Sequence, residues 1–356
     1  MAAAVVACLL ATLSVTLASS GGSGGKRPGP SPAAGSSPRG SLATPQVPGA
    51  GSAAPAPLGL RPKPSASPAA NPTPSRAPSP GPSAVASGPT PTGAPSGGAP
   101  GPLIRAAFFY PWYPESWYPS IHFTPTLGAP YNSSAPGVIA YQVAAMEYAH
   151  IEVAIASWWG PGTATDQRIP LLLDAAAGTG LKWALYYEPG PGTQAADLAY
   201  IYSHYAANPD YEHFDGRPVL FVYSRSVASC ADAANWVTVN AGRFYLDLQV
   251  FAGYRSCAVQ PDQWHQYAPV ERQDEQAGHS FSVSPGFWLY SSTTPLLDRD
   301  PVAFTQAVQA MVASGEPWQL VTTWNEWGEG TAVEDAVQWQ SADGYGQYVD
   351  ILHANP

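Results

Sequence analysis

The chain has 356 residues and a formal net charge of −10, but its charged and aromatic residues are unevenly distributed. Residues 1–102 carry 6 basic and no acidic residues, whereas residues 103–356 carry 25 acidic residues, 9 basic residues and all 12 tryptophans. The resulting charge of −16 on the second part argues against nucleic acid as a partner and fits a neutral or basic ligand.

The first 102 residues have the composition of targeting and linker segments. Residues 1–20, MAAAVVACLLATLSVTLASS, are small and apolar and resemble a secretory signal peptide. They lack the usual basic start, so we expect either a cleaved signal or a retained N-terminal membrane anchor. Residues 21–102 hold 21 of the 40 prolines and few large apolar residues, which predicts a disordered Pro/Gly/Ser/Ala-rich linker. The protein is therefore expected to be secreted or held at the cell surface.

Residues 103–356 alternate short apolar runs with amphipathic stretches, which predicts strands joined by crossover helices. Strands are expected at 104–110, 152–157, 182–187, 217–223, 243–250, 263–267, 280–284 and 318–323. Helices are expected at 137–149, 166–177, 194–207, 231–239, 301–313 and 344–353. Eight strands in 254 residues predict an α/β fold of the (β/α)8 TIM-barrel class, with little helix in the fifth and sixth units.

Aromatic and polar residues follow the ends of these strands, where TIM barrels place their active sites. Tryptophan rings can cover the apolar face of a sugar, and carboxylates can reach its hydroxyl groups. The shared position predicts a carbohydrate site formed by Tyr110, Trp112, Trp158, Trp159, Glu188, Tyr223, His265, Tyr267, Asn325, Glu326 and Glu329. Each residue taken alone has a structural alternative, since a single tryptophan is more often part of a core.

The stretch after the last strand, Trp324–Gly330 (WNEWGEG), contains the carboxylate pair Glu326 and Glu329. Glycoside hydrolysis usually needs one carboxyl group that donates a proton and one that acts as base or nucleophile. Trp324 and Trp327 would supply an apolar wall that keeps a carboxyl group protonated near neutral pH. The alternative is an ordinary acidic surface loop.

Two cysteines lie outside the leader, Cys230 and Cys257, and an exported protein is expected to join them in a disulfide. Two free buried thiols are the alternative. No histidine cluster accompanies these cysteines in the sequence, so we expect no metal site and no cofactor.

Six motifs occur in an order that resembles glycoside hydrolase family 99, the endo-α-mannosidase and endo-α-mannanase family. They are FFYPWY (108–113), SWWG (157–160), LLLDAA (171–176), YEP (187–189), RPVLFVY (217–223) and NEWGEGT (325–331). The resemblance implies a (β/α)8 barrel that cleaves internal α-1,2-mannosidic bonds with retention of configuration. It also implies that Glu326 removes the proton of the sugar 2-hydroxyl and that Glu329 protonates the leaving oxygen, while Glu188, Tyr110 and Tyr223 line the site.

The chain departs from the family pattern at Gly328, where a histidine is common, and in the loop 115–134. Such loops shape substrate subsites, so a related hydrolase of α-glucan or of a cell-wall polysaccharide stays open as an alternative. A barrel that binds carbohydrate without cleaving it is the other alternative. In each case the partner is an oligo- or polysaccharide, and the chain is expected to act as a monomer.

Overall fold

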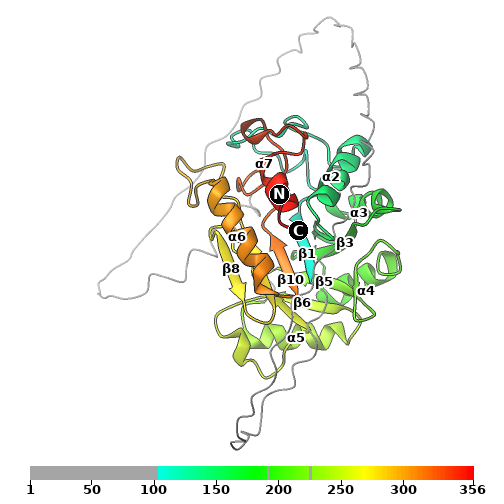
Figure 1. Ribbon diagram of the computed structural model, residues 1–356. Coiled ribbons are helices and arrows are strands. Elements are labelled where there is room, and N and C mark those ends of the chain that lie inside the picture. Colours follow the sequence, from blue (N-terminus) through cyan, green and yellow to red (C-terminus); the bar gives the residue numbers. More distant parts are fainter. Residues whose placement is uncertain (1–102, 191, 224–226) are drawn as a thin grey trace, which may run out of the picture. The chain divides into compact units, whose positions relative to one another are not determined.

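The computed structural model describes residues 103–190, 192–223 and 227–356. The expected signal peptide at 1–20 and the expected linker at 21–102 lie outside the described residues. Figure 1 shows the described part as a strand-rich centre surrounded by helices. No helix within this part has the length and apolar character needed to cross a membrane.

All eight predicted strands are present, and they pair in parallel in the order expected of a barrel. They are β1 (Ile104–Phe109), β2 (Val153–Trp158), β3 (Lys182–Tyr187), β5 (Arg217–Val222), β6 (Tyr245–Gln249), β7 (Gln263–His265), β9 (Ser280–Val283) and β10 (Trp318–Val321). Parallel ladders run β7-β6-β5-β3-β2-β1-β10-β9. Strands β1, β2 and β10 are buried along their whole length, which explains their mostly apolar sequences.

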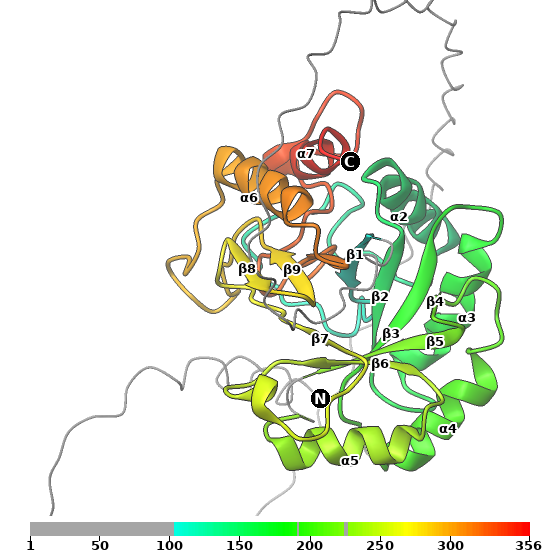
Figure 2. The same ribbon diagram turned by 60° about the horizontal axis from the view of Figure 1, so that its bottom comes forward.

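The barrel is nearly closed, with its seam between β7 and β9. Side chains bridge this seam in place of a strand ladder. The Ser282 hydroxyl donates to the Gln266 carbonyl, and the Ser284 hydroxyl donates to the Pro269 carbonyl at 2.9 Å. Figure 2 shows the strands arranged in a ring with the helices outside it.

Two short strands were not expected from the sequence. β4 (His213–Phe214) forms a hairpin with β5, and β8 (Gln273–Gln276) pairs antiparallel with β9. β4 has only two residues and β8 is polar, so neither contains an apolar run that would reveal a strand. Along the chain, β8 comes between β7 and β9, where a regular barrel would have a helix. This agrees with the expected shortage of helix in this region.

Helices cover the outside of the barrel at α2 (Pro136–Tyr148), α3 (Ala164–Ala176), α4 (Gln194–His204), α5 (Cys230–Asn240), α6 (Pro301–Ser314) and α7 (Gln347–His353). Side-chain caps fix several of their starts. Thr163, Thr193 and Ser229 each accept a hydrogen bond from a backbone N–H of the following turn. Asp300 caps α6 by accepting from Val302 and Ala303, as in an N-cap followed by proline.

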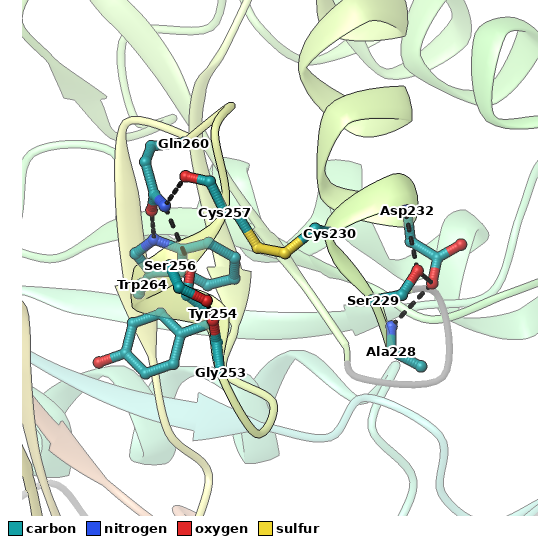
Figure 3. Close-up of a disulfide and its surroundings, with 10 residues drawn as sticks. All are labelled: Ala228, Ser229, Cys230, Asp232, Gly253, Tyr254, Ser256, Cys257, Gln260 and Trp264. Carbon is teal, nitrogen blue, oxygen red and sulfur yellow. Dashed lines mark hydrogen bonds between the residues drawn. A yellow bond between two sulfur atoms is a disulfide. The ribbon is translucent and has the colours of Figure 1, made fainter.

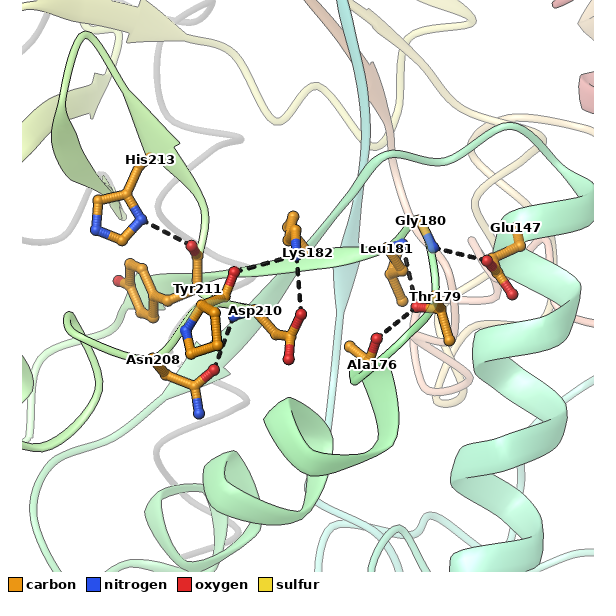
Figure 4. A network of polar contacts seen from close by, with 11 residues as sticks. Glu147, Ala176, Thr179, Gly180, Leu181, Lys182, Asn208, Asp210, Tyr211 and His213 are labelled. Carbon is orange, nitrogen blue, oxygen red and sulfur yellow. Dashed lines mark hydrogen bonds and ion pairs between the residues drawn. The ribbon is translucent and has the colours of Figure 1, made fainter.

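Polar contacts brace the end of the barrel at which the strands begin, opposite the predicted site (Figure 4). Lys182, the first residue of β3, donates to Asp210 at 2.8 Å and to the Pro209 carbonyl at 3.1 Å. Glu147 of α2 accepts from the Gly180 backbone at 2.8 Å. In TIM barrels this end serves stability, and the strand ends serve catalysis.

The predicted disulfide is confirmed, and it joins Cys230 to Cys257 (Figure 3). Cys230 begins α5, and Cys257 follows the short 3-10 helix η2 (Tyr254–Ser256) after β6. The bond closes a loop between residues 27 apart and fastens the loop after β6 to a helix. It therefore stabilises the part of the barrel that has the fewest helices.

Replacing both cysteines by serine is expected to lower the free energy of unfolding by about 2–4 kcal/mol, because the unfolded chain loses its cross-link. Urea denaturation of the double variant beside the oxidised protein measures the difference. A loss below about 0.5 kcal/mol would contradict a stabilising role for this bond.

Candidate active site

The loop after β10, from Thr323 to Thr331, is closed at its base by its own residues. The hydroxyls of Thr323 and Thr331 lie 2.9 Å apart, and the Thr323 backbone N–H donates to the Thr331 carbonyl at 3.2 Å. The Thr323 hydroxyl also accepts from the Glu326 backbone at 2.9 Å. These bonds hold the residues between 324 and 330 as one rigid turn at the end of the strand.

Outside contacts fix the far side of this loop. Gly330 has a φ of 65°, and a Cβ there would lie 2.8 Å from the Trp288 carbonyl oxygen, so the position requires glycine. The Arg299 side chain donates to the carbonyls of Gly330 and Ala332. Its guanidinium also lies 3.9 Å from the centroid of the Trp339 ring, so an enclosed cation braces the loop. No local pattern around Arg299 in the sequence pointed to this role.

Glu326 and Glu329 lie together in an enclosed site. Glu326 is 4% exposed, and Glu329 is half-buried. Burial raises the pKa of Glu326 well above its usual range, and the nearby charge of Glu329 raises it further, followed by that of Glu188. Burial also raises the pKa of Glu329 to about 7, with a further upward effect from Glu188. Three carboxyl groups therefore interact in one site, and the pKa values of Glu326 and Glu329 are raised there.

Each member of the pair has a different set of hydrogen bonds. One oxygen of Glu326, Oε1, accepts from the Gly328 backbone at 2.9 Å. The other, Oε2, is buried without a hydrogen-bond partner among the described residues. Glu329 instead accepts from the Tyr267 hydroxyl at 3.0 Å, which stabilises its ionised form and lowers its pKa. The two carboxyl groups are thus placed in unequal environments, as acid and base roles require.

A chain of hydroxyl groups leads to Glu329. The Tyr110 hydroxyl donates to the Tyr267 hydroxyl at 2.9 Å, and Tyr267 donates to Glu329. Burial, together with the charges of the nearby glutamates, raises the pKa of both tyrosines well above 10. Both therefore stay protonated, and they orient Glu329 as hydrogen-bond donors.

Glu188 follows β3 directly and accepts from the Ser157 hydroxyl of β2 at 2.6 Å. Its charge acts on Tyr110, Glu326 and Glu329, which places it among the predicted site residues. Parallel strands bring their ends to one edge, so residues far apart in sequence meet here.

An aromatic wall stands beside the carboxyl groups. The rings of Tyr110 and Trp112 have centroids 4.3 Å apart, and those of Trp112 and Trp159 are 5.1 Å apart. Trp159 is half-buried, whereas Tyr110 and Trp112 are 5% and 7% exposed. Tyr223 is 9% exposed and packs against the Tyr186 ring at 5.8 Å. These predicted residues offer only narrow ring surfaces to a ligand.

Asn325 and Trp327 do not lie where a substrate could contact them, because both side chains are enclosed within the protein. Asn325 is 0% exposed, and it exchanges hydrogen bonds with the Tyr110 backbone at 2.7 and 3.1 Å. Trp327 is 1% exposed and donates from its indole to the Tyr131 hydroxyl at 3.1 Å. Their side chains hold the loop of Glu326 and Glu329 against the residues that follow β1.

Two tyrosines that the sequence did not single out complete this support. The Tyr113 hydroxyl donates to the Asn325 carbonyl at 3.0 Å and accepts from the Trp327 backbone. The Tyr131 hydroxyl accepts from Asn325 and donates to the buried Glu334 at 2.8 Å. Tyr113 stands in the FFYPWY motif, which was a usable signal, whereas Tyr131 lies in the divergent loop and had none.

Trp158 and His265 also lie in the core rather than on the surface of the site. Both are 0% exposed. The Trp158 indole donates to Asp166 of α3 at 2.7 Å, so this ring faces the helix layer. His265 Nδ1 lies 2.8 Å from the carboxyl group of Asp247, inside the barrel. Successive side chains of a strand point to opposite faces, and the position of a residue in the sequence did not reveal which face its side chain would occupy.

No group of three or more histidine, cysteine, aspartate or glutamate side chains within the described ranges is arranged to hold a metal ion. The functional groups of the site are carboxyl groups, hydroxyl groups and aromatic rings. Such a set suits proton transfer to and from a polyhydroxylated ligand.

The sequence of residues 118–254 matches glycosyl hydrolase family 99. In this segment the chain is similar to that family. The matched residues include Glu188 and end before the loop of Glu326 and Glu329, so the place of this pair rests on the geometry described above.

The relatives of this chain are distant. It is 23% identical over 285 residues to the glycoprotein endo-alpha-1,2-mannosidase of Xenopus laevis, covering 66% of this chain and 62% of the relative. It is 24% identical over 265 residues to a glycoprotein endo-alpha-1,2-mannosidase-like protein of Mus musculus, covering 60% and 58%. The chain thus spans about three fifths of the length of these relatives.

Solved structures support the fold of this chain. The GH99 endo-alpha-mannosidase of Bacteroides thetaiotaomicron with bound BIS-TRIS-propane superimposes with a TM-score of 0.59 at 22% identity. The match covers 71% of this chain and 94% of that one. A glycoside hydrolase-like protein matches with a TM-score of 0.56 at 13% identity, covering 71% and 94%. These likenesses agree with the nearly closed, mostly parallel barrel.

Proposed function

We propose that this chain is an exported glycoside hydrolase that cleaves internal α-mannosidic, or similar α-glycosidic, bonds with retention of configuration. The observation that carries the proposal is the meeting of Glu326, Glu329 and Glu188 in one enclosed site at the strand ends. The family match and the relatives named as endo-alpha-1,2-mannosidases support it. We further propose that the barrel is a (β/α)8 TIM barrel in which the loop after β6 and the β8 hairpin replace two helices.

In the proposed reaction Glu326 removes the proton from the sugar 2-hydroxyl while that oxygen attacks the anomeric carbon. The glycosidic bond breaks as Glu329 transfers its proton to the leaving oxygen, and a 1,2-anhydro sugar results. Glu329 then removes a proton from water, whose oxygen opens the three-membered ring at the anomeric carbon. Glu326 returns its proton to the 2-oxygen, so two inversions give net retention. The hydroxyl chain from Tyr110 through Tyr267 keeps Glu329 oriented in both steps.

The pair must hold a single proton when the reaction starts. Burial favours the protonated form of both carboxyl groups, and the Tyr267 hydroxyl favours an ionised Glu329. The proposed reaction uses the arrangement with the proton on Glu329, and the two carboxyl groups titrate as a coupled pair.

This account predicts how kcat/KM depends on pH. Burial raises the pKa of Glu329 to about 7 and also raises the pKa of Glu326. At low pH both carboxyl groups hold protons and no base is present, and at high pH no acid remains, so a plot of kcat/KM against pH should be bell-shaped. Both limbs of this profile are expected at higher pH than for carboxyl groups exposed to water.

The Glu188→Gln variant tests the cause of these shifts. The negative charge of Glu188 raises the pKa values of Glu326 and Glu329. Removal of this charge is therefore expected to move both limbs of the pH profile to lower pH. Glu212→Gln is a matched control, because this carboxyl group has a pKa raised to about 7 by burial but precedes β5 at the opposite end of the barrel. An unchanged profile in Glu188→Gln, or an equal shift in the control, would contradict the proposed coupling.

Hydrolysis of α-mannan and α-glucan oligosaccharides by the purified chain tests the substrate class. Release of shorter oligosaccharides from α-mannan chains, in preference to α-glucan chains, is the expected result. Preference for the α-glucan would move the assignment to a related hydrolase. Tight binding without release of product would favour a carbohydrate-binding barrel.

A further inference from the structure

Two surface loops meet over the loop that carries Glu326 and Glu329. The backbone N–H of Trp288 donates to the Glu329 carbonyl, and that of Tyr290 donates to the Gly328 carbonyl, both at 2.8 Å. On the other side, His122 stacks on the Trp288 ring with centroids 4.0 Å apart and contacts the Leu289 carbonyl at 3.0 Å. The three loops are thus fixed to one another by backbone and ring contacts.

A second stacked pair, Tyr118 and Tyr290, joins the same two loops. Their ring centroids are 3.9 Å apart, and their planes differ by 13°. Both side chains are half-buried, in contrast to the enclosed rings of Trp158 and Trp327. The pair therefore presents aromatic surface that neither loop buries completely.

This pair lies directly beside the carboxyl group of Glu326. A Cβ placed on Gly328 would lie 3.0 Å from the Tyr118 ring atom Cδ2 and 2.9 Å from Glu326 Oε1. A single methyl group at position 328 would thus contact both the Glu326 carboxyl group and the Tyr118 ring. The Tyr118 ring occupies space that a side chain at this position would need. Gly328 is required here for this close approach rather than for an unusual backbone angle.

We propose that the stacked pair Tyr118–Tyr290 is a sugar-binding platform that forms a subsite next to Glu326 and helps to select the glycan. The inference rests on the proposed function, since it assigns a substrate contact to the same site. Aromatic faces pack well against the apolar C–H face of a pyranose ring, and hydroxyl tips can meet its polar edge. Stacking also fixes both rings before binding, so little conformational freedom is lost when a sugar arrives.

The test is calorimetric titration of the full chain with α-mannan and α-glucan oligosaccharides, in a Glu329→Gln background that slows hydrolysis. Tyr118→Ala and Tyr290→Ala are each expected to raise the Kd of the preferred oligosaccharide by about tenfold, as for the loss of an aromatic contact residue. Tyr118→Phe keeps the ring and is expected to stay within about threefold of the parent. The control is Tyr202→Ala on α4, where a tyrosine 48% exposed packs on Phe244.

Thermal unfolding of each variant separates folding from binding. A folded Tyr118→Ala or Tyr290→Ala protein that binds as tightly as the parent would overturn the platform, as would a parent that binds none of the oligosaccharides. Hydrolysis by the unsubstituted chain on the same oligosaccharides judges the proposed function separately. Hydrolysis with unchanged Kd values would reject the platform and keep the hydrolase. If the alanine variants bind more weakly but the unsubstituted chain hydrolyses none of the oligosaccharides, the platform would be supported and the hydrolase rejected.

Discussion

Replacing Glu329 or Glu326 by glutamine is expected to lower kcat for the preferred oligosaccharide by about 10³- to 10⁴-fold, because each change removes a proton donor or acceptor of the reaction. Glutamine keeps the size and the hydrogen-bonding oxygen of glutamate, so the loop closed by Thr323 and Thr331 should stay in place. In Glu329→Gln the Tyr267 hydroxyl can still donate to the amide oxygen. KM should therefore change far less than kcat.

The double variant separates a pair from two independent groups. Two carboxyl groups that act in the same reaction should give a double variant hardly slower than either single one, as in other catalytic units. Glu212→Gln controls for the loss of a buried carboxyl group with a raised pKa, and its kcat should stay near that of the unsubstituted chain. Wild-type kcat in either site variant would remove that residue from the mechanism.

Replacing His265 by leucine is expected to lower the free energy of unfolding by about 1–3 kcal/mol, the usual cost of leaving a buried polar group without its hydrogen-bond partner. His265 and Asp247 are both 0% exposed and lie 2.8 Å apart. Burial raises the pKa of Asp247, while His265 opposes that shift. Without the histidine the carboxyl group stays in the barrel interior with no compensating partner. Urea denaturation measures the loss.

A double variant, His265→Leu with Asp247→Leu, tests the explanation. Removal of both polar groups should restore part of the stability lost in the single variant, because no buried carboxyl group remains. If His265 instead contacted the substrate, as its position after β7 suggested, the single variant would raise KM at least tenfold with little loss of stability. That outcome would contradict the core position of this residue.

The barrel could be predicted from the sequence because strands such as β1 and β2 are mostly apolar. They are buried along their whole length, and a run of this type is visible without knowledge of its neighbours. The short strands β4 and β8 could not be predicted. β4 has only two residues and β8 is polar, and only pairing with β5 and β9 makes them strands.

The site was predictable in outline for a similar reason. Residues at the ends of parallel strands must meet at one end of a barrel, so Glu188, Glu326 and Glu329 could be grouped from strand order alone. The direction of each side chain was not predictable. His265 and Trp158 each find a polar partner inside the protein, Asp247 and Asp166, and these partners lie 18 and 8 residues away in the sequence.

The supporting residues depended on loops, where sequence patterns carry the least information. Arg299 contacts two carbonyls of the segment that follows β10, and aromatic side chains from separate segments surround its guanidinium group. Tyr118 meets Tyr290 only because two loops converge on the backbone of Gly328 and Glu329. Such contacts are tertiary, and no local sequence periodicity predicts them.

The most direct measurement is the identity and configuration of the first products that the full chain releases from an α-mannan oligosaccharide, followed by mass spectrometry and proton NMR. The account predicts cleavage at internal bonds, so the first products are oligosaccharides, and their new reducing ends initially have the α configuration. Release of single sugars from a chain end, or products that first appear in the β configuration, would contradict a retaining, endo-acting site built on Glu326 and Glu329.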